Sequence, residues 1–215
     1  MLTRSAPYEF GSVSGFRAAA VEASPTDDNW WVVAWAICAD PLPGYHIVHS
    51  KTAPSSADVQ TAEARCPSGR RALGVGAEIL APANSHGVGL QVVRASGNGD
   101  LTRAQAHEQP QGYPYDWQLV ASAICADTPE GYQVRYGESE EQASETTKYA
   151  QAYCYGQITG AGAAVSNVAP GNVALYFVVP RRPSDERTNS AAAAAEITPT
   201  SEPWDFIVAQ AICVR

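Results

Sequence analysis

The 215-residue chain lacks several features that would assign it to a common functional class. No stretch is long and apolar enough to cross a membrane as a helix, and residues 1–7 contain no signal-peptide core. Basic residues are few, with 14 Lys and Arg against 22 Asp and Glu, which gives a formal net charge of -8. Neutralising phosphates requires clustered Lys and Arg. We therefore expect neither a nucleic-acid partner nor insertion into a membrane.

Signatures of common catalytic and metal sites are missing as well. The sequence has no Gly-x-Ser-x-Gly nucleophile elbow and no Cys-x-x-Cys pair, and its four histidines do not recur in register. The pairs Gly74-x-Gly76 and Gly160-x-Gly162 lack the strand-to-helix context of a dinucleotide loop, so they are expected to shape strands. We expect no metal and no cofactor, and no catalytic residue can be assigned.

What the sequence does contain is one unit that occurs three times, which is the first feature to seek in an unknown chain. An Ala-x-Ala-Ile-Cys motif recurs at almost equal spacing and ends at Cys38, Cys125 and Cys213. A second motif, a Cys followed by Gly-x-Gly-Ala, begins at Cys66 and at Cys154. The pattern predicts a single domain, 1–215, of three repeats at approximately 1–65, 66–153 and 154–215. The first repeat is incomplete at its front.

The repeated segments have the composition of β-strands. They are short, rich in Val, Ile, Tyr and Trp, and bounded by Gly, Pro, Asn and Asp. The alanine run 191–195 would suit a helix on propensity, but its counterparts 18–21 and 104–107 are too short for one. We therefore predict an all-β fold with three pseudo-symmetric, four-stranded antiparallel sheets.

The cysteine, glycine and Ala-x-Ala-Ile-Cys motifs resemble those of secreted actinobacterial proteins built from threefold repeats. Their general plan is similar to the vitelline membrane outer layer proteins, which implies a β-prism. The jacalin-type lectins share the prism, but their sugar-site motifs are not evident here. A β-trefoil is the main alternative with threefold symmetry, although its units are usually shorter than this period.

Five cysteines at matching positions argue for a disulfide framework and an extracellular setting. Joining the end of each unit to the start of the next predicts the bonds Cys38–Cys66 and Cys125–Cys154. Cys213 is then expected to be a free thiol or to pair outside this chain. The alternative is that all five are small buried residues in a reducing compartment.

Aromatic residues give the stronger indication of a ligand site. Trp31 stands where the other two units carry Gln118 and Phe206, and Trp35 stands where they carry Ser122 and Gln210. A Trp at a position that is polar elsewhere exposes apolar area without a folding reason, and such residues are favoured at binding surfaces. The alternative is a packing residue or a contact to a neighbouring domain.

Two sets of polar residues are further candidates. The loop with Arg94, Asn98 and Asp100 follows an apolar strand, and such loops carry specificity in many scaffolds. One acid recurs in each unit, as Glu22, Glu108 and Glu196. These acids either form a ring that binds a cation or sugar hydroxyls, or they are solvated strand ends.

Three functions follow from these features. The first is a secreted, non-enzymatic module that binds a carbohydrate or a cell surface. The second is a structural or assembly protein that packs with sibling subunits or another domain through an open sheet edge. The third is an enzyme acting on glycans or a cell wall, for which the sequence offers no catalytic residues.

Overall fold

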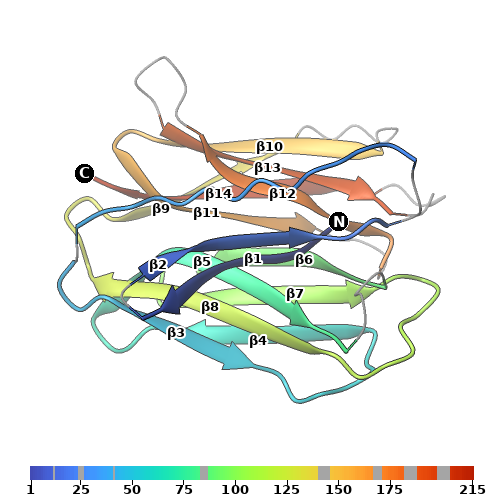
Figure 1. The fold of residues 1–215 in the computed structure, drawn as a ribbon. Coiled ribbons are helices and arrows are strands. Elements are labelled where there is room, and N and C mark those ends of the chain that lie inside the picture. The colour runs from blue at the N-terminus through green and yellow to red at the C-terminus, as the bar shows by residue number, and fades with distance from the viewer. Residues whose placement is uncertain are drawn as a thin grey trace.

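The computed structural model describes residues 1–11, 13–23, 27–40, 42–82, 87–139, 146–166, 171–181, 188–197 and 204–215. Within these ranges the chain forms fourteen antiparallel β-strands and no helix, in three sheets (Figure 1). The predicted all-β fold is confirmed.

The three sheets differ in size. The first has five strands in the order β2 (Val13–Ala20), β1 (Leu2–Phe10), β5 (Arg70–Leu80), β8 (Gln118–Asp127), β3 (His46–Lys51). The second has six, ordered β4 (Val59–Arg65), β7 (Leu101–Glu108), β6 (Val88–Ala95), β11 (Gln157–Ser166), β14 (Phe206–Val214), β9 (Gln133–Glu138). The third has three, ordered β10 (Thr147–Cys154), β13 (Thr188–Glu196), β12 (Val173–Arg181). Four strands in every sheet, as expected from the sequence, are therefore not confirmed.

Three strand pairs share one irregularity of register. The pairs β1–β2, β6–β7 and β12–β13 each contain a bulge in the first strand, between Leu2 and Arg4, Leu90 and Val92, and Leu175 and Phe177. Each bulge lies opposite two consecutive residues of an alanine-rich strand. Aligning the three pairs on the bulge makes Ser5, Val93 and Val178 corresponding residues.

The two strands with Gly-x-Gly-Ala motifs also match. β5 pairs with β8 and has a bulge between Ala72 and Gly74, and β11 pairs with β14 and has a bulge between Ile158 and Gly160. On its other edge, β5 pairs with β1 through Ala77 and Ser5, while β11 pairs with β6 through Ala163 and Val93. In both sheets the Gly-x-Gly-Ala strand therefore lies between a closing Ala-x-Ala-Ile-Cys strand and a strand that pairs with an alanine-rich one.

Small residues allow these strands to pack closely. A Cβ atom on Gly160 would lie 2.5 Å from the carbonyl oxygen of Leu73 and 3.0 Å from the Cα atom of Gly74, so β11 meets β5 backbone to backbone. Along β8 the inward side chains Leu119, Ala121 and Ala123 are fully buried, and β8 contacts β4 and β7. β14 contacts β10 and β13 in the same way.

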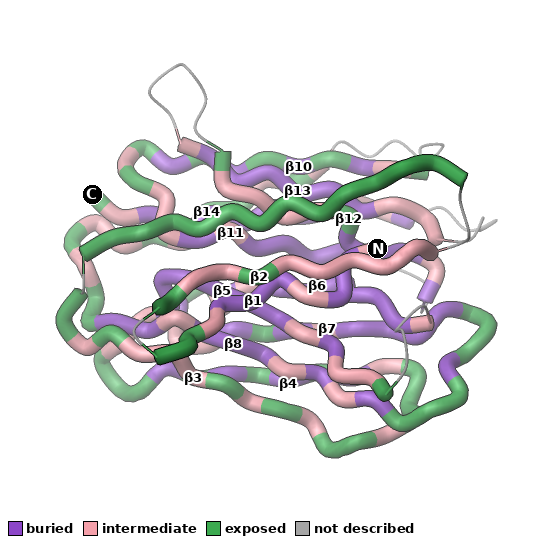
Figure 2. The backbone as a smooth tube through the Cα atoms, viewed as in Figure 1, coloured by how far each residue is buried: buried purple, intermediate pink, exposed green. Residues whose placement is uncertain are grey.

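The first Ala-x-Ala-Ile-Cys segment departs from the strand that its sequence predicts. Residues 29–39 belong to none of the described sheets, and all of them are exposed. Figure 2 shows this part of the chain as a long exposed tube that crosses the whole molecule, passing over β14 and β12 in this view. Strand formation there would require a neighbouring strand, because a strand is stable only when its backbone groups are paired.

The disulfides also differ from the prediction. The bonds are Cys66–Cys125 and Cys154–Cys213, with Cα–Cα distances of 5.7 and 5.6 Å, and the described free cysteine is the exposed Cys38. The predicted bonds Cys38–Cys66 and Cys125–Cys154 and the free thiol at Cys213 are therefore wrong. Each opening cysteine precedes the strand that pairs with the closing strand of its own unit, so it lies beside that closing cysteine rather than the preceding one.

Candidate functional site

An open groove lies on the described surface. It has a volume of about 590 Å³ and lies between residues 30–35, β12 and the β1–β2 pair. A smaller hollow of about 80 Å³ continues it toward residues 74–75 of β5 and 159–161 of β11. The two share a lining of Ser5, Ala18, Val33, Trp35 and Val178. The groove therefore runs from the surface toward the contact between β5 and β11.

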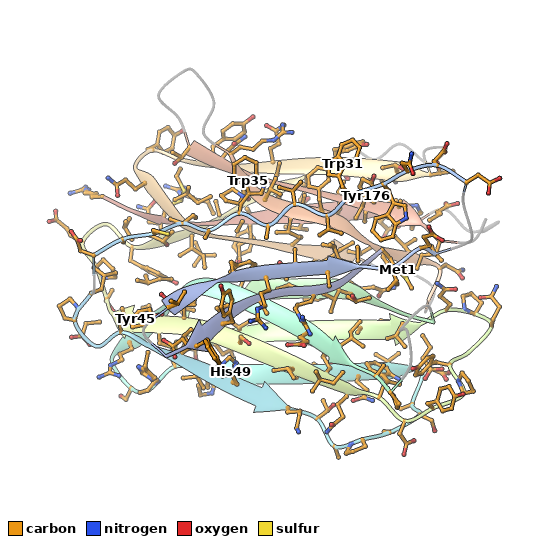
Figure 3. All side chains as sticks on the ribbon, in the orientation of Figure 1. Met1, Trp31, Trp35, Tyr45, His49 and Tyr176 are labelled. Carbon is orange, nitrogen blue, oxygen red and sulfur yellow. A yellow bond between two sulfur atoms is a disulfide. The ribbon has the colours of Figure 1, made fainter. Side chains whose placement is uncertain are left out.

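Large aromatic side chains line this groove. Trp31, Trp35 and Tyr176 are 81%, 60% and 61% exposed, and all three line it. Figure 3 shows Trp31 and Trp35 projecting from the same extended segment, with Tyr176 near Trp31. The structure thus places both predicted tryptophans at one cavity.

The groove is also bounded by backbone without strand partners. β12 is the edge strand of its three-stranded sheet, and in the described part of the chain it pairs with β13 alone. Residues 29–39 form the opposite wall and also lie outside the described sheets. Such edges present N–H and C=O groups that can form a ladder with an added strand.

Two of the three recurring acids accept a hydrogen bond from the tryptophan of their own unit. The indole Nε1 of Trp117 donates a 2.8 Å hydrogen bond to Glu108 Oε1, and the backbone N–H of Tyr113 donates to Glu108 Oε2 at 2.9 Å. Trp30 Nε1 donates a similar bond of 2.7 Å to Glu22 Oε1. Glu108 is buried, whereas Glu22 lies at the groove. In two units, then, the acid orients the tryptophan of its own unit.

The predicted polar loop lies outside the groove. Ser96 Oγ donates to Asn98 Oδ1 at 2.8 Å and to Asp100 Oδ1 at 2.6 Å, and Arg65 forms an ion pair with Asp100. The hydrogen bond from Ser96, helped by Arg65, lowers the pKa of Asp100. Asn98 and Asp100 thus form hydrogen bonds that hold their own turn together, and neither they nor Arg94 are brought to Trp31 and Trp35.

One serine–histidine contact resembles a catalytic pair but is closed to a substrate. His49 Nδ1 lies 2.8 Å from Ser122 Oγ, and Ser122 is buried between β3 and β5. A nucleophile must reach its substrate. This pair therefore serves the packing of β3 on β8.

The described residues contain neither a metal-binding cluster nor a membrane-spanning helix. In the ranges that the structure describes, no three His, Cys, Asp or Glu side chains gather closely enough to hold a metal ion. The same ranges form no helix with the length and apolarity needed to span a bilayer.

Comparison with known proteins assigns no relative. No protein-family model matches the chain, and neither a curated protein nor a solved structure matches it.

Sequence reasoning found one wall of the groove and missed the other. Trp35 stands out because both other units have a polar residue at its position, and Trp31 because one of them does. Tyr176 and the free edge of β12 were missed. A signal was present, because residues 175–181 are the one apolar strand of this type without a Gly-x-Gly-Ala segment left in the sequence to pair with it.

Proposed function

We propose that this protein is a secreted, non-enzymatic binding module that takes up an extended polypeptide strand in the groove. The strand would extend the sheet of β12 and cover residues 30–38, which is recognition by strand addition. The two disulfides support an oxidising, extracellular setting, since such bonds persist there and are rare in the cytosol.

The observation that carries the proposal is the pair of facing backbone edges. β12 and residues 29–39 both line one groove, and neither has a described strand partner on that side. Main-chain hydrogen bonds supply affinity in strand addition, and side-chain pockets supply selectivity. A single strand placed between these edges would satisfy both.

The proposal includes a threefold plan for the molecule. Three bulged pairs at Leu2, Leu90 and Leu175 support it, together with the two equally bulged Gly-x-Gly-Ala strands. On this plan the molecule has a prism-like arrangement, similar to that of the vitelline membrane outer layer proteins. The third sheet would have room for one more central strand.

A carbohydrate is the second candidate ligand. The exposed rings of Trp31, Trp35 and Tyr176 support it, because planar aromatic side chains present apolar faces beside polar groups. Glu22 and Glu196 also line the groove and could accept hydrogen bonds from sugar hydroxyls. This candidate leaves the free backbone edges without a role, so we rank it second.

Amide hydrogen exchange separates the two ligands. The protein would be incubated with a peptide of residues 147–166, which spans β10 and β11, and separately with chitin and cellulose hexasaccharides. Under the proposal, the peptide slows exchange of amides in both 30–38 and 173–181, because a strand hydrogen-bonds to both walls. A sugar that stacks on Trp31 and Trp35 would leave most of these amides unprotected.

Two results would overturn the strand proposal. One is saturable binding of a hexasaccharide that is lost in Trp31→Ala or Trp35→Ala, with no protection by any peptide. The other is peptide binding that protects amides elsewhere and leaves 30–38 and 173–181 unchanged. Tyr155→Ala is a matched control, because this exposed aromatic residue does not line the groove.

A further inference from the structure

We infer that the strand accepted by the groove carries the repeat's own pattern, a strand, a cysteine and then Gly-x-Gly-Ala, and that its cysteine forms a disulfide with Cys38. This inference rests on the proposed function and names the partner. The partner is a polypeptide segment from outside residues 1–215, and residues 147–166 of this chain are its template.

The edge of β12 matches two edges that already hold such a strand. Val178 corresponds to Ser5 and Val93 through the shared bulge. Ser5 pairs with Ala77, and Val93 pairs with Ala163, in each case the alanine that follows Gly-x-Gly. The alanine of an incoming strand would therefore lie opposite Val178.

The opposite wall matches as well. Ala34 corresponds to Ala121 and Ala209, which pair with Ala77 and Ala163, the same two alanines. Ala34 and Val178 both line the smaller hollow, so an alanine of the partner would lie between them.

The glycines of the partner are required by close contacts on both sides. In the existing pairs, Gly160 approaches the backbone of Leu73 and Gly74, and the smaller hollow is lined by these strands. On the other side, Gly76 faces Ser122 and Gly162 faces Gln210, the residues that correspond to Trp35. A glycine opposite Trp35 leaves space for the indole ring, whereas a β-branched residue would collide with it or with the central backbones.

The strand that precedes the cysteine has a place too. β4 leads into Cys66 and pairs with β7, and β10 contains Cys154 and pairs with β13. β2 corresponds to β7 and β13, yet it is an edge strand. The first part of the partner would therefore pair with β2 and cover the inner face of residues 30–38.

Burial of the tryptophans shows how much this inner face lacks. Trp117 and Trp204 are 0% and 3% exposed, whereas Trp30, which precedes the first motif in the same way, is 48% exposed. In the two buried cases, the closing strands β8 and β14 pack against β4 and β10. A strand on β2 would supply the corresponding contact for Trp30.

This placement brings the partner's cysteine to Cys38. Cys38 corresponds to Cys125 and Cys213, which are bonded to Cys66 and Cys154. Bond formation removes two electrons and two protons from the two thiols, and a small-molecule disulfide takes them up and becomes two thiols. When the partner cysteine carries glutathione as a mixed disulfide, the Cys38 thiolate attacks the partner sulfur and glutathione leaves as the thiolate, with no net oxidation.

The test uses the peptide of residues 147–166 with Cys154 as its glutathione mixed disulfide. Three controls accompany it: the same peptide with Gly160→Val and Gly162→Val, a peptide of reversed sequence, and the protein variant Cys38→Ser. Intact mass would follow adduct formation, and hydrogen exchange would follow residues 13–20, 30–38 and 173–181.

We expect a one-to-one adduct at Cys38 that forms at least tenfold faster with the template peptide than with either altered peptide. The Cys38→Ser protein should bind the template reversibly and show protection of the same three segments. Equal adduct rates for the template and reversed peptides would overturn the inference, because reaction at Cys38 would then reflect exposure alone.

The outcome also distinguishes the inference from the proposed function. If all extended peptides protect β12 and residues 30–38 equally, and valine in place of the glycines has no effect, the partner is not a repeat strand but strand addition stands. If no peptide protects either segment, both fail. Dimer formation by the protein alone, with protection of residues 30–38, would show that a second copy is the occupant and would also overturn the inference.

Discussion

At the scale of single residues, one glutamate–tryptophan pair appears in two very different surroundings. Glu108 and Trp117 are buried, while Glu22 and Trp30 form the same hydrogen bond at the surface of the groove. A buried indole N–H without an acceptor loses its hydrogen bond to water and gains nothing in return. The pair should therefore stabilise the fold at one site and contribute little at the other.

Replacing Glu108 by alanine should lower the free energy of unfolding by roughly 2–3 kcal/mol, because it leaves Trp117 Nε1 and the Tyr113 N–H unpaired. The matched variant Glu22→Ala should change stability by less than about 0.5 kcal/mol, as is usual for surface positions. Urea unfolding followed by tryptophan fluorescence measures both. Equal losses would show that the buried hydrogen bonds are not what stabilises this site.

His107 makes stability depend on pH. Burial in β7 lowers its pKa to about 4, although the nearby Asp58 opposes the shift. The unfolded chain binds a proton near pH 6.5, where the folded chain does not, so stability should fall as pH drops from about 6.5 toward 4. Urea unfolding at pH 7 and pH 5 should show a smaller difference for His107→Gln than for the wild type. An unchanged difference would mean that other groups set the acid sensitivity.

At the scale of elements, the Gly-x-Gly-Ala strands determine how closely the sheets approach. β11 meets β5 at Gly160, where even one methyl group would contact backbone atoms. Backbone cannot move aside as a flexible side chain can, so the added atom would separate the two strands.

Gly160→Ala should therefore destabilise the protein by roughly 1–3 kcal/mol. Gly97→Ala is the control, because a Cβ there would meet Tyr136 Oη at an ordinary 3.7 Å. Thermal unfolding by circular dichroism compares the two variants. A Gly160→Ala protein as stable as the control would mean that β5 and β11 separate without cost.

Strands were predictable from the sequence where their pairing was complete. Residues 118–127 and 206–214 form strands as their repeated motif indicates, and 188–196 is a strand despite its alanine content. Residues 30–38 carry the same motif yet lie outside the described sheets, because a strand needs neighbours and local sequence does not report them. The disulfides were predicted wrongly for a similar reason. The repeats show which cysteines correspond to one another, but they do not show which cysteines lie side by side in the fold.

The candidate site was predictable in part. Comparison of the repeats identified Trp31 and Trp35. A buried position has no room to exchange a polar residue for a large ring, so a position where this exchange occurs is expected to be exposed. The loop at Arg94, Asn98 and Asp100 looked equally suitable, but its polar groups bond to each other and to Arg65. A sequence lists hydrogen-bonding groups without saying which of them pair.

At the scale of the whole molecule, two disulfides join the three sheets. Cys66 follows β4 of the six-stranded sheet, and Cys125 lies in β8 of the five-stranded one. Cys154 lies in β10 of the three-stranded sheet, and Cys213 lies in β14 of the six-stranded one. The six-stranded sheet is thus bonded to both of the others.

Removing one of these bonds should cost far more than removing the free thiol. Each bond closes a loop with a sequence separation of 59 residues, for which chain entropy suggests ~4 kcal/mol. Cys125→Ser should lower the unfolding free energy by an amount of this order, whereas Cys38→Ser should leave it nearly unchanged. Intact mass after alkylation without reduction should show one modified cysteine, Cys38. Modification at Cys213 would contradict the bonding pattern.

These two disulfides connect the sheets in a row, so neither of them joins the three-stranded sheet to the five-stranded one. The groove lies between these two sheets, which no disulfide in the described residues connects. A pulling force or a rising temperature should separate these two sheets first, whereas the two disulfide-bonded pairs of sheets should stay together until their bonds are reduced. A third disulfide at Cys38 would connect the three sheets in a closed covalent ring, which could be opened only by breaking one of the bonds.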